Sequence, residues 1–273
     1  MGMPAPPNMK PQTFFTPFVL HLLLPSLFGV YSEAHVVNFY ISNNCPFPIW
    51  PATAPNRGEA LIGDGGFFLP SGMARTVQAP WRTNGRIWAR TGCDCSPNST
   101  RPCRCDTGDC GRLACGGRTG TPPATLVQFS LQGGTGNPHS FSVSVVDGYN
   151  LPVSVWGKTA NCYLGGCSKD LKKTCPEELE LRGKNGEVVG CKSACLAFNL
   201  DVFCCRNRYG SPETCRGSNY SKMFKDACPN YYSYAFDSTA PVLRCAAEEF
   251  AITFCPNRWG RGWAETSPAI ISL

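Results

Sequence analysis

Cysteines are the residues with the most evident chemistry in this chain of 273 residues, which contains 18 of them. All follow residue 34, and their number is even. In an exported chain this pattern is typical of a disulfide framework. A zinc site is the alternative, since Cys191 and Cys195 are close enough to share a metal, but no Cys-x-x-Cys pair and no histidine pair in register occur. We expect nine disulfides, no metal site and no cofactor. The 18 cysteines allow about 34 million complete pairings, so their number alone selects none.

Other signatures of chemistry are few. No Gly-x-Ser-x-Gly motif occurs, which disfavours a serine hydrolase, and only His35 and His139 follow residue 34. Two sequons predict N-glycosylation, at Asn98 and at Asn219. The loop that holds Asn98 is short, polar and bounded by cysteines, so we expect it to be exposed. The second sequon adjoins a predicted helix start.

The first 34 residues have the features of a signal peptide. Lys10 precedes an apolar stretch at 14–30, and Ser32-Glu33-Ala34 places small residues at the two positions that signal peptidase inspects. A transmembrane anchor is the alternative, but two prolines interrupt the stretch. We expect cleavage after Ala34 and an exported, soluble, monomeric protein.

The formal net charge is +6. Lys10 and Glu33 cancel, so the chain after residue 34 keeps the same charge. Such a protein is attracted to anionic surfaces such as acidic cell-wall polymers or membranes, although simple solubility is a sufficient explanation. Basic residues are scattered, and Lys172-Lys173 is their only adjacent pair, so we expect no nucleic-acid partner.

Period-two alternation of apolar residues dominates the first half of the chain. It predicts short strands with one buried face, and Asn-Gly, Gly-Gly and Asp-Gly pairs supply turns between them. Many short strands separated by turns favour an antiparallel sandwich. The strands are expected around Val37–Ile41, Ile87–Ala89, Val127–Leu131, Phe141–Val145 and, near the end, Phe250–Phe254.

Composition changes after Trp156, because residues 162–245 hold ten cysteines and few aliphatic residues. Bridges must therefore hold this region, with short helices expected at 192–200 and 221–227. We predict a signal peptide at 1–34, a sandwich formed by 35–157 and 246–256, a disulfide-rich lobe at 158–245 and a C-terminal extension at 257–273.

Seven sequence blocks occur in order between residues 43 and 256. They are Asn43-Asn44-Cys45-Pro46-Phe47, Gly85-Arg86-Ile87-Trp88-Ala89-Arg90-Thr91-Gly92-Cys93, Cys105-Asp106-Thr107-Gly108-Asp109-Cys110-Gly111, Pro122-Pro123-Ala124-Thr125-Leu126, Val146-Asp147-Gly148-Tyr149-Asn150-Leu151-Pro152, Tyr232-Ser233-Tyr234-Ala235 and Phe254-Cys255-Pro256. Together these blocks make the chain resemble the thaumatin-like (pathogenesis-related class 5) family. The resemblance implies a flattened β-sandwich with an attached disulfide-rich region, and a defence or cell-wall protein secreted to the apoplast or cell wall.

The family framework has sixteen cysteines, and sixteen of those present match it. Cys95 and Cys103 are left over inside the Cys93–Cys105 loop, so they most simply pair with each other. The resemblance implies the pairs Cys45–Cys255, Cys93–Cys105, Cys110–Cys115, Cys162–Cys245, Cys167–Cys228, Cys175–Cys191, Cys195–Cys204 and Cys205–Cys215.

A cleft with one arginine and four acidic residues is typical of the family. Arg86 and Asp147 match that pattern, whereas three acidic positions fall on Gln128, Ser142 and Asn230. The formal cleft charge thus changes from −3 in the family pattern to 0 here. Arg86, Gln128 and Ser142 occupy the more polar face of their strands. The alternatives are ordinary solvated sheet residues, or an Arg86–Asp147 ion pair of purely structural value.

Three functions follow from this reasoning. The first is binding of a β-glucan-like carbohydrate in the cleft without hydrolysis, for which amide, hydroxyl and guanidinium groups are suited. The second is a β-1,3-glucan hydrolase, which needs two carboxylates about 5–10 Å apart, whereas the cleft set retains only Asp147. The third is a membrane-perturbing antifungal protein, which the basic charge permits. We expect the first, and therefore no enzyme activity.

Overall fold

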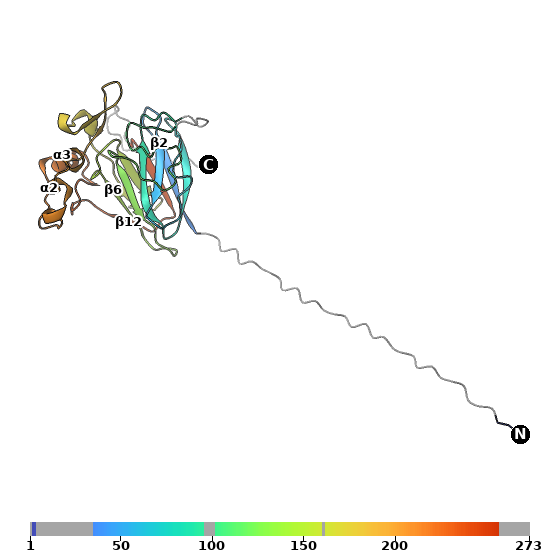
Figure 1. Cartoon of the computed structure of the whole chain (residues 1–273). Coiled ribbons are helices and arrows are strands. Elements are labelled where there is room, and N and C mark those ends of the chain that lie inside the picture. Colours follow the sequence, from blue (N-terminus) through green and yellow to red (C-terminus); the bar gives the residue numbers. More distant parts are fainter. Residues whose placement is uncertain (1, 4–34, 96–101, 160–161, 257–273) are drawn as a thin grey trace. The chain divides into compact units, whose positions relative to one another are not determined.

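The structure, a computed structural model, describes residues 2–3, 35–95, 102–159 and 162–256 (Figure 1). Apart from residues 2–3, the predicted signal peptide lies outside these residues, as do the Asn98 sequon and the C-terminal extension. Among the helices of the described segments, none combines the length and the apolar character that crossing a membrane would need. The mainly β fold class predicted from the alternation is confirmed.

The first sheet has five strands in the order β3-β1-β13-β7-β8. Its strands are β3 (Ala74–Pro80), β1 (Val36–Asn43), β13 (Glu249–Phe254), β7 (Val153–Gly157) and β8 (Tyr163–Leu164). The first and last of these in the chain, β1 and β13, pair in parallel, with Phe39 opposite Phe250. The sandwich is therefore not wholly antiparallel, which period-two alternation cannot reveal because it carries no information on strand direction.

The second sheet has the order β11-β6-β5-β4-β2, and β12 also pairs with β6. Its strands are β11 (Tyr231–Tyr232), β6 (His139–Ser144), β5 (Leu126–Ser130), β4 (Asn84–Arg90), β2 (Trp50–Pro55) and β12 (Leu243–Cys245). The lobe predicted at 158–245 thus contributes three short strands, β8, β11 and β12, to the two sheets.

Aromatic side chains fill the space between the two sheets. Phe39 and Phe250 come from the first sheet and Phe129 and Phe141 from the second, and all four are at least 95% buried. The rings of Phe141 and Phe250 lie 4.3 Å apart and those of Phe39 and Phe129 lie 5.1 Å apart. Because these residues alternate with polar ones along their strands, the opposite face of each sheet is turned away from the core.

The cysteine-rich region contains short helices and one hairpin. Figure 1 shows α2 and α3 lying together to one side of the sheets. The predicted helix at 192–200 is shorter in the structure, because Ser193 caps its start and Asn199 adopts the left-handed conformation at its end. A capping box of Ser218 and Ser221 starts α3 two residues before the predicted position. The elements are β9 (Glu180–Arg182), β10 (Val188–Cys191), α1 (Ala194–Phe198), α2 (Asp201–Cys204) and α3 (Asn219–Ala227), with single 3-10 turns at Leu171–Lys173, Glu177–Leu179 and Asn207–Tyr209.

Nine disulfides connect the described cysteines, and no free cysteine remains among them. They are the eight pairs that the resemblance implies together with the nested Cys95–Cys103 bridge. Cys45–Cys255 joins the ends of β1 and β13, which are 210 residues apart in the chain. Five of the nine bridges have both cysteines within 158–245.

Candidate functional site

Three of the predicted site residues form a row across the second sheet. Arg86 of β4 lies opposite Gln128 of β5, and Gln128 lies opposite Ser142 of β6. The hydroxyl of Ser142 donates a 3.5 Å hydrogen bond to Oε1 of Gln128. The residues that flank them in sequence, such as Val127 and Val143, are buried in the core, so the row lies on the outer face. We refer to these three residues as the Arg86 row.

A second polar row runs beside it, one step along the strands. Asn84, Ser130 and Ser140 lie opposite one another on β4, β5 and β6, and Arg244 of β12 lies opposite Ser140. Glu59 accepts a 2.7 Å hydrogen bond from the amide of Asn84 and a further one from its backbone N–H. Glu59 and Arg244 could not be predicted at this face, because neither lies in a matched block or shares a predicted strand with Arg86.

On the other side of the Arg86 row, the same face is covered. Trp88 lies on the same face of β4 as Arg86, and Leu126 lies on the same face of β5 as Gln128. Both are nevertheless buried, in a small cluster with Cys110 and Cys115. The indole N–H of Trp88 donates a 2.8 Å hydrogen bond to the carbonyl oxygen of Gly108. A loop thus packs over the apolar part of the face and leaves the polar part open, which explains the imperfect polar alternation along these strands.

The other two predicted residues lie at the edges of this face. Asp147 is exposed in a turn that follows β6, closed by a 2.9 Å hydrogen bond from Gly148 N–H to the carbonyl of Val145. Asn230 directly precedes β11, whose Tyr231 lies opposite Val143, so its backbone lies beside Ser142. The side-chain nitrogen of Asn230 lies close to Gly165: a Cβ atom added to Gly165 would stand 3.3 Å from it. Within the described residues, no ion pair joins Arg86 and Asp147.

A buried carboxylate fixes the chain around β11. Asp237 accepts hydrogen bonds from the backbone and hydroxyl groups of Ser233 and Thr239, and Lys225 Nζ lies 2.9 Å from its carboxylate. Lys225 also donates a 2.9 Å bond to the carbonyl of Tyr231. Burial alone would raise the pKa of Asp237, but the bonds from Thr239, Lys225 and Ser233 hold this pKa at about 2. The network therefore connects α3 to the strand that positions Asn230.

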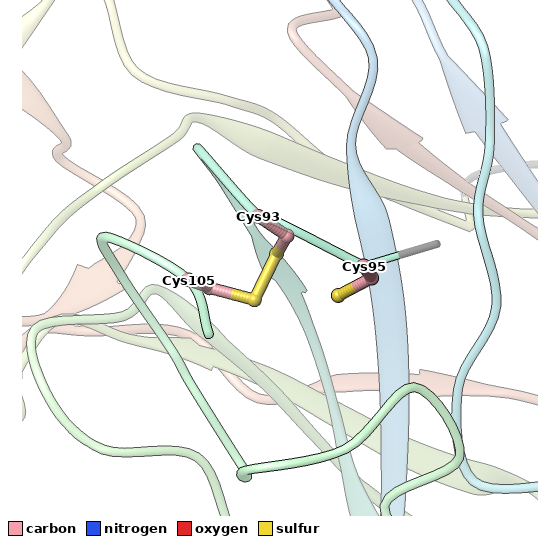
Figure 2. A group of neighbouring side chains, drawn as sticks. All are labelled: Cys93, Cys95 and Cys105. Atoms are coloured by element: carbon pink, nitrogen blue, oxygen red, sulfur yellow. A yellow bond between two sulfur atoms is a disulfide. The ribbon is translucent and has the colours of Figure 1, made fainter. Parts of the chain in front are cut away.

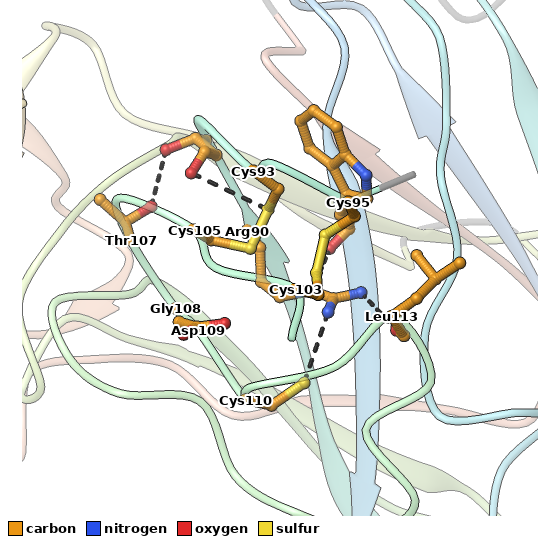
Figure 3. Close-up of a disulfide and its surroundings, with 12 residues drawn as sticks. Arg90, Cys93, Cys95, Cys103, Cys105, Thr107, Gly108, Asp109, Cys110 and Leu113 are labelled. Atoms are coloured by element: carbon orange, nitrogen blue, oxygen red, sulfur yellow. Dashed lines mark hydrogen bonds between the residues drawn. A yellow bond between two sulfur atoms is a disulfide. The ribbon is translucent and has the colours of Figure 1, made fainter. Parts of the chain in front are cut away.

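Arg90, on the same strand as Arg86, is fully buried. Its guanidinium donates to the carbonyl oxygens of Trp50 at 3.0 Å, Arg112 at 2.6 Å and Leu113 at 2.9 Å. Figure 3 shows it directed toward Cys110 and Leu113. Burial lowers the pKa of Arg90 to about 10, while the nearby charge of Asp109 opposes this shift. Arg90 therefore binds the covering loop to β2 and takes no part in the open face.

Sulfur atoms gather beside this loop. The Sγ atoms of Cys93, Cys95 and Cys105 lie within 4.8 Å of one another (Figure 2). Cys93 is bonded to Cys105, and Cys95 to Cys103, so these sulfurs are not the thiolates that a metal ion requires. The cluster is accordingly explained by two nested disulfides.

A hollow of about 520 Å³ lies elsewhere, beside β3 at the edge of the first sheet. Asp64 and Arg75, 3.7 Å apart, stand at its border, and Arg75 also lies over the ring of Phe67. None of the five predicted site residues lines it. The candidate site is therefore an open polar sheet face rather than this hollow.

The comparisons with known proteins agree with the blocks in the sequence. Residues 43–256 match the model of the thaumatin family. A pathogenesis-related thaumatin-like protein 3.5 of Cryptomeria japonica is 42% identical over 86% of this chain and 96% of its own length. Pathogenesis-related protein 5 of Arabidopsis thaliana is 45% identical over 80% of this chain and 90% of its own. A Prunus avium protein named glucan endo-1,3-beta-glucosidase is 39% identical over 83% and 93%.

One solved structure, titled as that of the thaumatin-like xylanase inhibitor TLXI, is also similar, with 22% identity and a TM-score of 0.45. It covers 80% of this chain and 99% of that one. The family match extends over most of the chain, and the curated relatives exceed 30% identity over nearly all of their own length. The chain belongs to the thaumatin family.

Proposed function

We propose that this protein is a secreted defence or cell-wall protein that binds a neutral, β-glucan-like polysaccharide without hydrolysing it. The Arg86 row would contact the glycan, with Asp147 and Asn230 at the edges of the binding face. The observation that carries this proposal is the register of Arg86, Gln128 and Ser142, which places a guanidinium, an amide and a hydroxyl side by side on an open face. Each can donate a hydrogen bond to a sugar hydroxyl, and the last two also accept one.

The spacing of the carboxylates supports binding over hydrolysis. The carboxylate of Glu59 is hydrogen-bonded to Asn84, which lies in the same register row as Ser140 of β6. Asp147 lies beyond Ser144, the residue at which β6 ends. Four residues of strand span about 13 Å, which exceeds the roughly 5–10 Å that separates the two carboxyl groups of a glycosidase. Glu59 also accepts two hydrogen bonds from Asn84, so both of its carboxylate oxygens are already engaged.

A glucan hydrolase is the second candidate, because one relative is named glucan endo-1,3-beta-glucosidase. This candidate predicts that the protein releases reducing sugar from β-1,3-glucan, and that Asp147→Asn or Glu59→Gln abolishes the release. Our proposal predicts no release by the unmodified protein. A membrane-perturbing role instead predicts dye release from anionic vesicles, which the proposed site gives no reason to expect.

Titration calorimetry with a soluble β-1,3-gluco-oligosaccharide tests the binding face. Gln128→Ala and Ser142→Ala each remove one side chain of the Arg86 row. We expect each to weaken binding roughly fivefold, the effect of about 1 kcal/mol for one hydrogen bond. Asn185→Ala, which truncates an exposed amide in the β9–β10 hairpin, is the matched control and should bind normally.

Salt provides an independent test of the same face. Because the ligand is neutral, its affinity should change little between about 0.05 and about 0.5 M salt. If the oligosaccharide binds but neither variant of the Arg86 row weakens it, the glycan is held elsewhere and the proposal for this face is wrong.

We also propose N-glycosylation at Asn98 and Asn219. Asn219 is exposed in the first turn of α3, although the hydroxyl of Ser221 in its sequon is engaged in the capping box with Ser218. Asn98 lies outside the described residues. Glycosidase treatment of the protein from a eukaryotic secretory host should lower its mass. The mass lost on treatment should be smaller for Asn219→Gln than for the unmodified protein, because the variant lacks one glycan. An unchanged mass would contradict both sites.

A further inference from the structure

The outer face of the first sheet carries aromatic side chains that the proposed function does not use. Tyr40 of β1 lies opposite Ala251 of β13, which lies opposite Trp156 of β7, and Trp156 lies opposite Tyr163 of β8. The residues that flank them along each strand belong to the buried core or to its border, so Tyr40, Ala251 and Trp156 are on the side turned away from the second sheet. Tyr163, on the edge strand, also lies beside Gly165, close to the Asn230 side chain. We call Tyr40, Trp156 and Tyr163 the aromatic row.

Two members of the aromatic row are well exposed, with 40% of the surface of Tyr40 and 59% of that of Tyr163 accessible. Trp156 is partly exposed. The strands of Tyr40 and Trp156, β1 and β7, are separated by β13 and lie about 10 Å apart. Because the β13 residue between them, Ala251, is small, it leaves space between the two rings. Single apolar residues are common on protein surfaces, but three aligned in one register row across a sheet form a patch.

Polar groups border the aromatic row on both sides. On one side Lys158 Nζ lies 2.7 Å from the carboxylate of Glu249, which also accepts a 3.3 Å hydrogen bond from the Tyr40 hydroxyl. The positive and negative charges there cancel. On the other side the hydroxyl residues Ser42, Thr253 and Ser154 lie opposite one another on β1, β13 and β7. Among the residues that the structure describes on this face, the centre is thus aromatic, one border is rich in hydroxyl groups, and the charges of Lys158 and Glu249 balance.

A pyranose ring has the complementary chemistry, since its C–H groups form an apolar face and its hydroxyls form a polar rim. Aromatic rings present a flat surface whose partial negative charge attracts such C–H groups, and neighbouring hydroxyl and amide groups fix orientation. We propose that the aromatic row binds a neutral polysaccharide chain laid across the strands, as a second glycan-binding surface on the opposite side of the sandwich from the Arg86 row. It shares the ligand class of the proposed function but uses no residue of that site.

A purely structural role is the competing explanation. Aromatic pairs across neighbouring strands stabilise sheets, and β8 has only two residues to hold it against β7. A structural role predicts that truncating Trp156 or Tyr163 lowers stability and leaves glycan binding unchanged. Tyr40 separates the two explanations best, because it lies on β1, which is paired along its length with both β3 and β13.

The test measures binding of the full secreted protein to insoluble β-1,3-glucan and, separately, to insoluble xylan. We expect Tyr40→Ala and Trp156→Ala each to weaken binding to one of these polymers roughly tenfold, the value of a good aromatic contact. Tyr40→Phe keeps the ring and should bind within about twofold of the unmodified protein. The control Phe68→Ala truncates another exposed aromatic residue, 46% accessible and outside the row, and should bind normally.

The outcomes separate this proposal from the proposed function. If Gln128→Ala weakens binding while Tyr40→Ala and Trp156→Ala do not, the aromatic row is not a glycan surface and the Arg86 row stands. The reverse result supports the aromatic row and contradicts the Arg86 row. If the unmodified protein binds neither polymer, both proposals are wrong. A dimer in sedimentation that Trp156→Ala dissociates, with glycan binding unaffected, would make the row a self-association surface and overturn the inference.

Discussion

The sandwich and the disulfide-rich region reach stability by different means. Between the sheets, Phe39, Phe129, Phe141 and Phe250 pack ring against ring, and Cys45–Cys255 links the ends of two strands that are already paired. In the disulfide-rich region, α2 buries none of its residues, yet Cys195–Cys204 and Cys205–Cys215 both anchor its C-terminal end.

Sequence changes in the two regions should therefore destabilise the protein by different routes. Burial of apolar surface stabilises the sandwich in proportion to the area removed from water. Bridges stabilise the disulfide-rich region chiefly by restricting its unfolded chain, and buried polar networks fix its position. Three predictions test this comparison.

The largest effect should come from the sandwich core. Phe141 is 1% exposed and contacts aromatic rings from both sheets. Phe141→Ala should lower the free energy of unfolding by about 3–5 kcal/mol, because it removes apolar contacts and leaves a cavity. Denaturant titration with the disulfides intact measures this. Met73→Ala, at a side chain 55% exposed, is the control with little expected effect. A loss below about 1 kcal/mol for Phe141→Ala would contradict the role assigned to the core.

A smaller and more local effect should follow removal of one bridge from the disulfide-rich region. Changing Cys205 and Cys215 together to serine opens a loop of 10 residues, which the chain-entropy account values at about 2–3 kcal/mol. We expect limited proteolysis to cut near α2 while the sandwich remains resistant. If the sandwich becomes as sensitive to the protease as the region around α2, the two regions unfold together and are not stabilised separately.

The smallest effect depends on pH. The folded pKa of Asp237, about 2, lies below its ordinary value of 3.8, so its contribution to stability is complete above about pH 4 and is lost as pH falls through 2. The difference corresponds to about 2 kcal/mol. Asp237→Asn should therefore destabilise the protein at neutral pH and flatten the loss of stability between pH 4 and 2. Equal pH dependence of the variant and the unmodified protein would show that another group is responsible.

Much of the sandwich could be predicted because alternation reports which face of a strand is buried. The strands around Phe141 and Phe250 follow directly from it, and strand parity places Arg86, Gln128 and Ser142 on outer faces. Pairing partners and directions could not be predicted, since the parallel contact of β1 with β13 joins segments from opposite ends of the chain. That contact depends on the packing of the complete core.

Tertiary contacts account for the parts of the site that the sequence left open. Arg90 has the parity of Arg86 and looks equally exposed in the sequence, but a loop buries it and supplies backbone carbonyls as its partners. Glu59 and Arg244 reach the polar face from segments without a matching motif. Side chains brought together by folding in this way leave no local pattern.

Binding and hydrolysis are separated by incubating the unmodified protein with insoluble β-1,3-glucan and measuring both the bound protein and the reducing ends released over time. Binding without hydrolysis predicts depletion of protein from solution, weakened in Gln128→Ala, and a reducing-end signal equal to that of the glucan alone. A steady release of reducing ends that Asp147→Asn abolishes would instead establish a hydrolase.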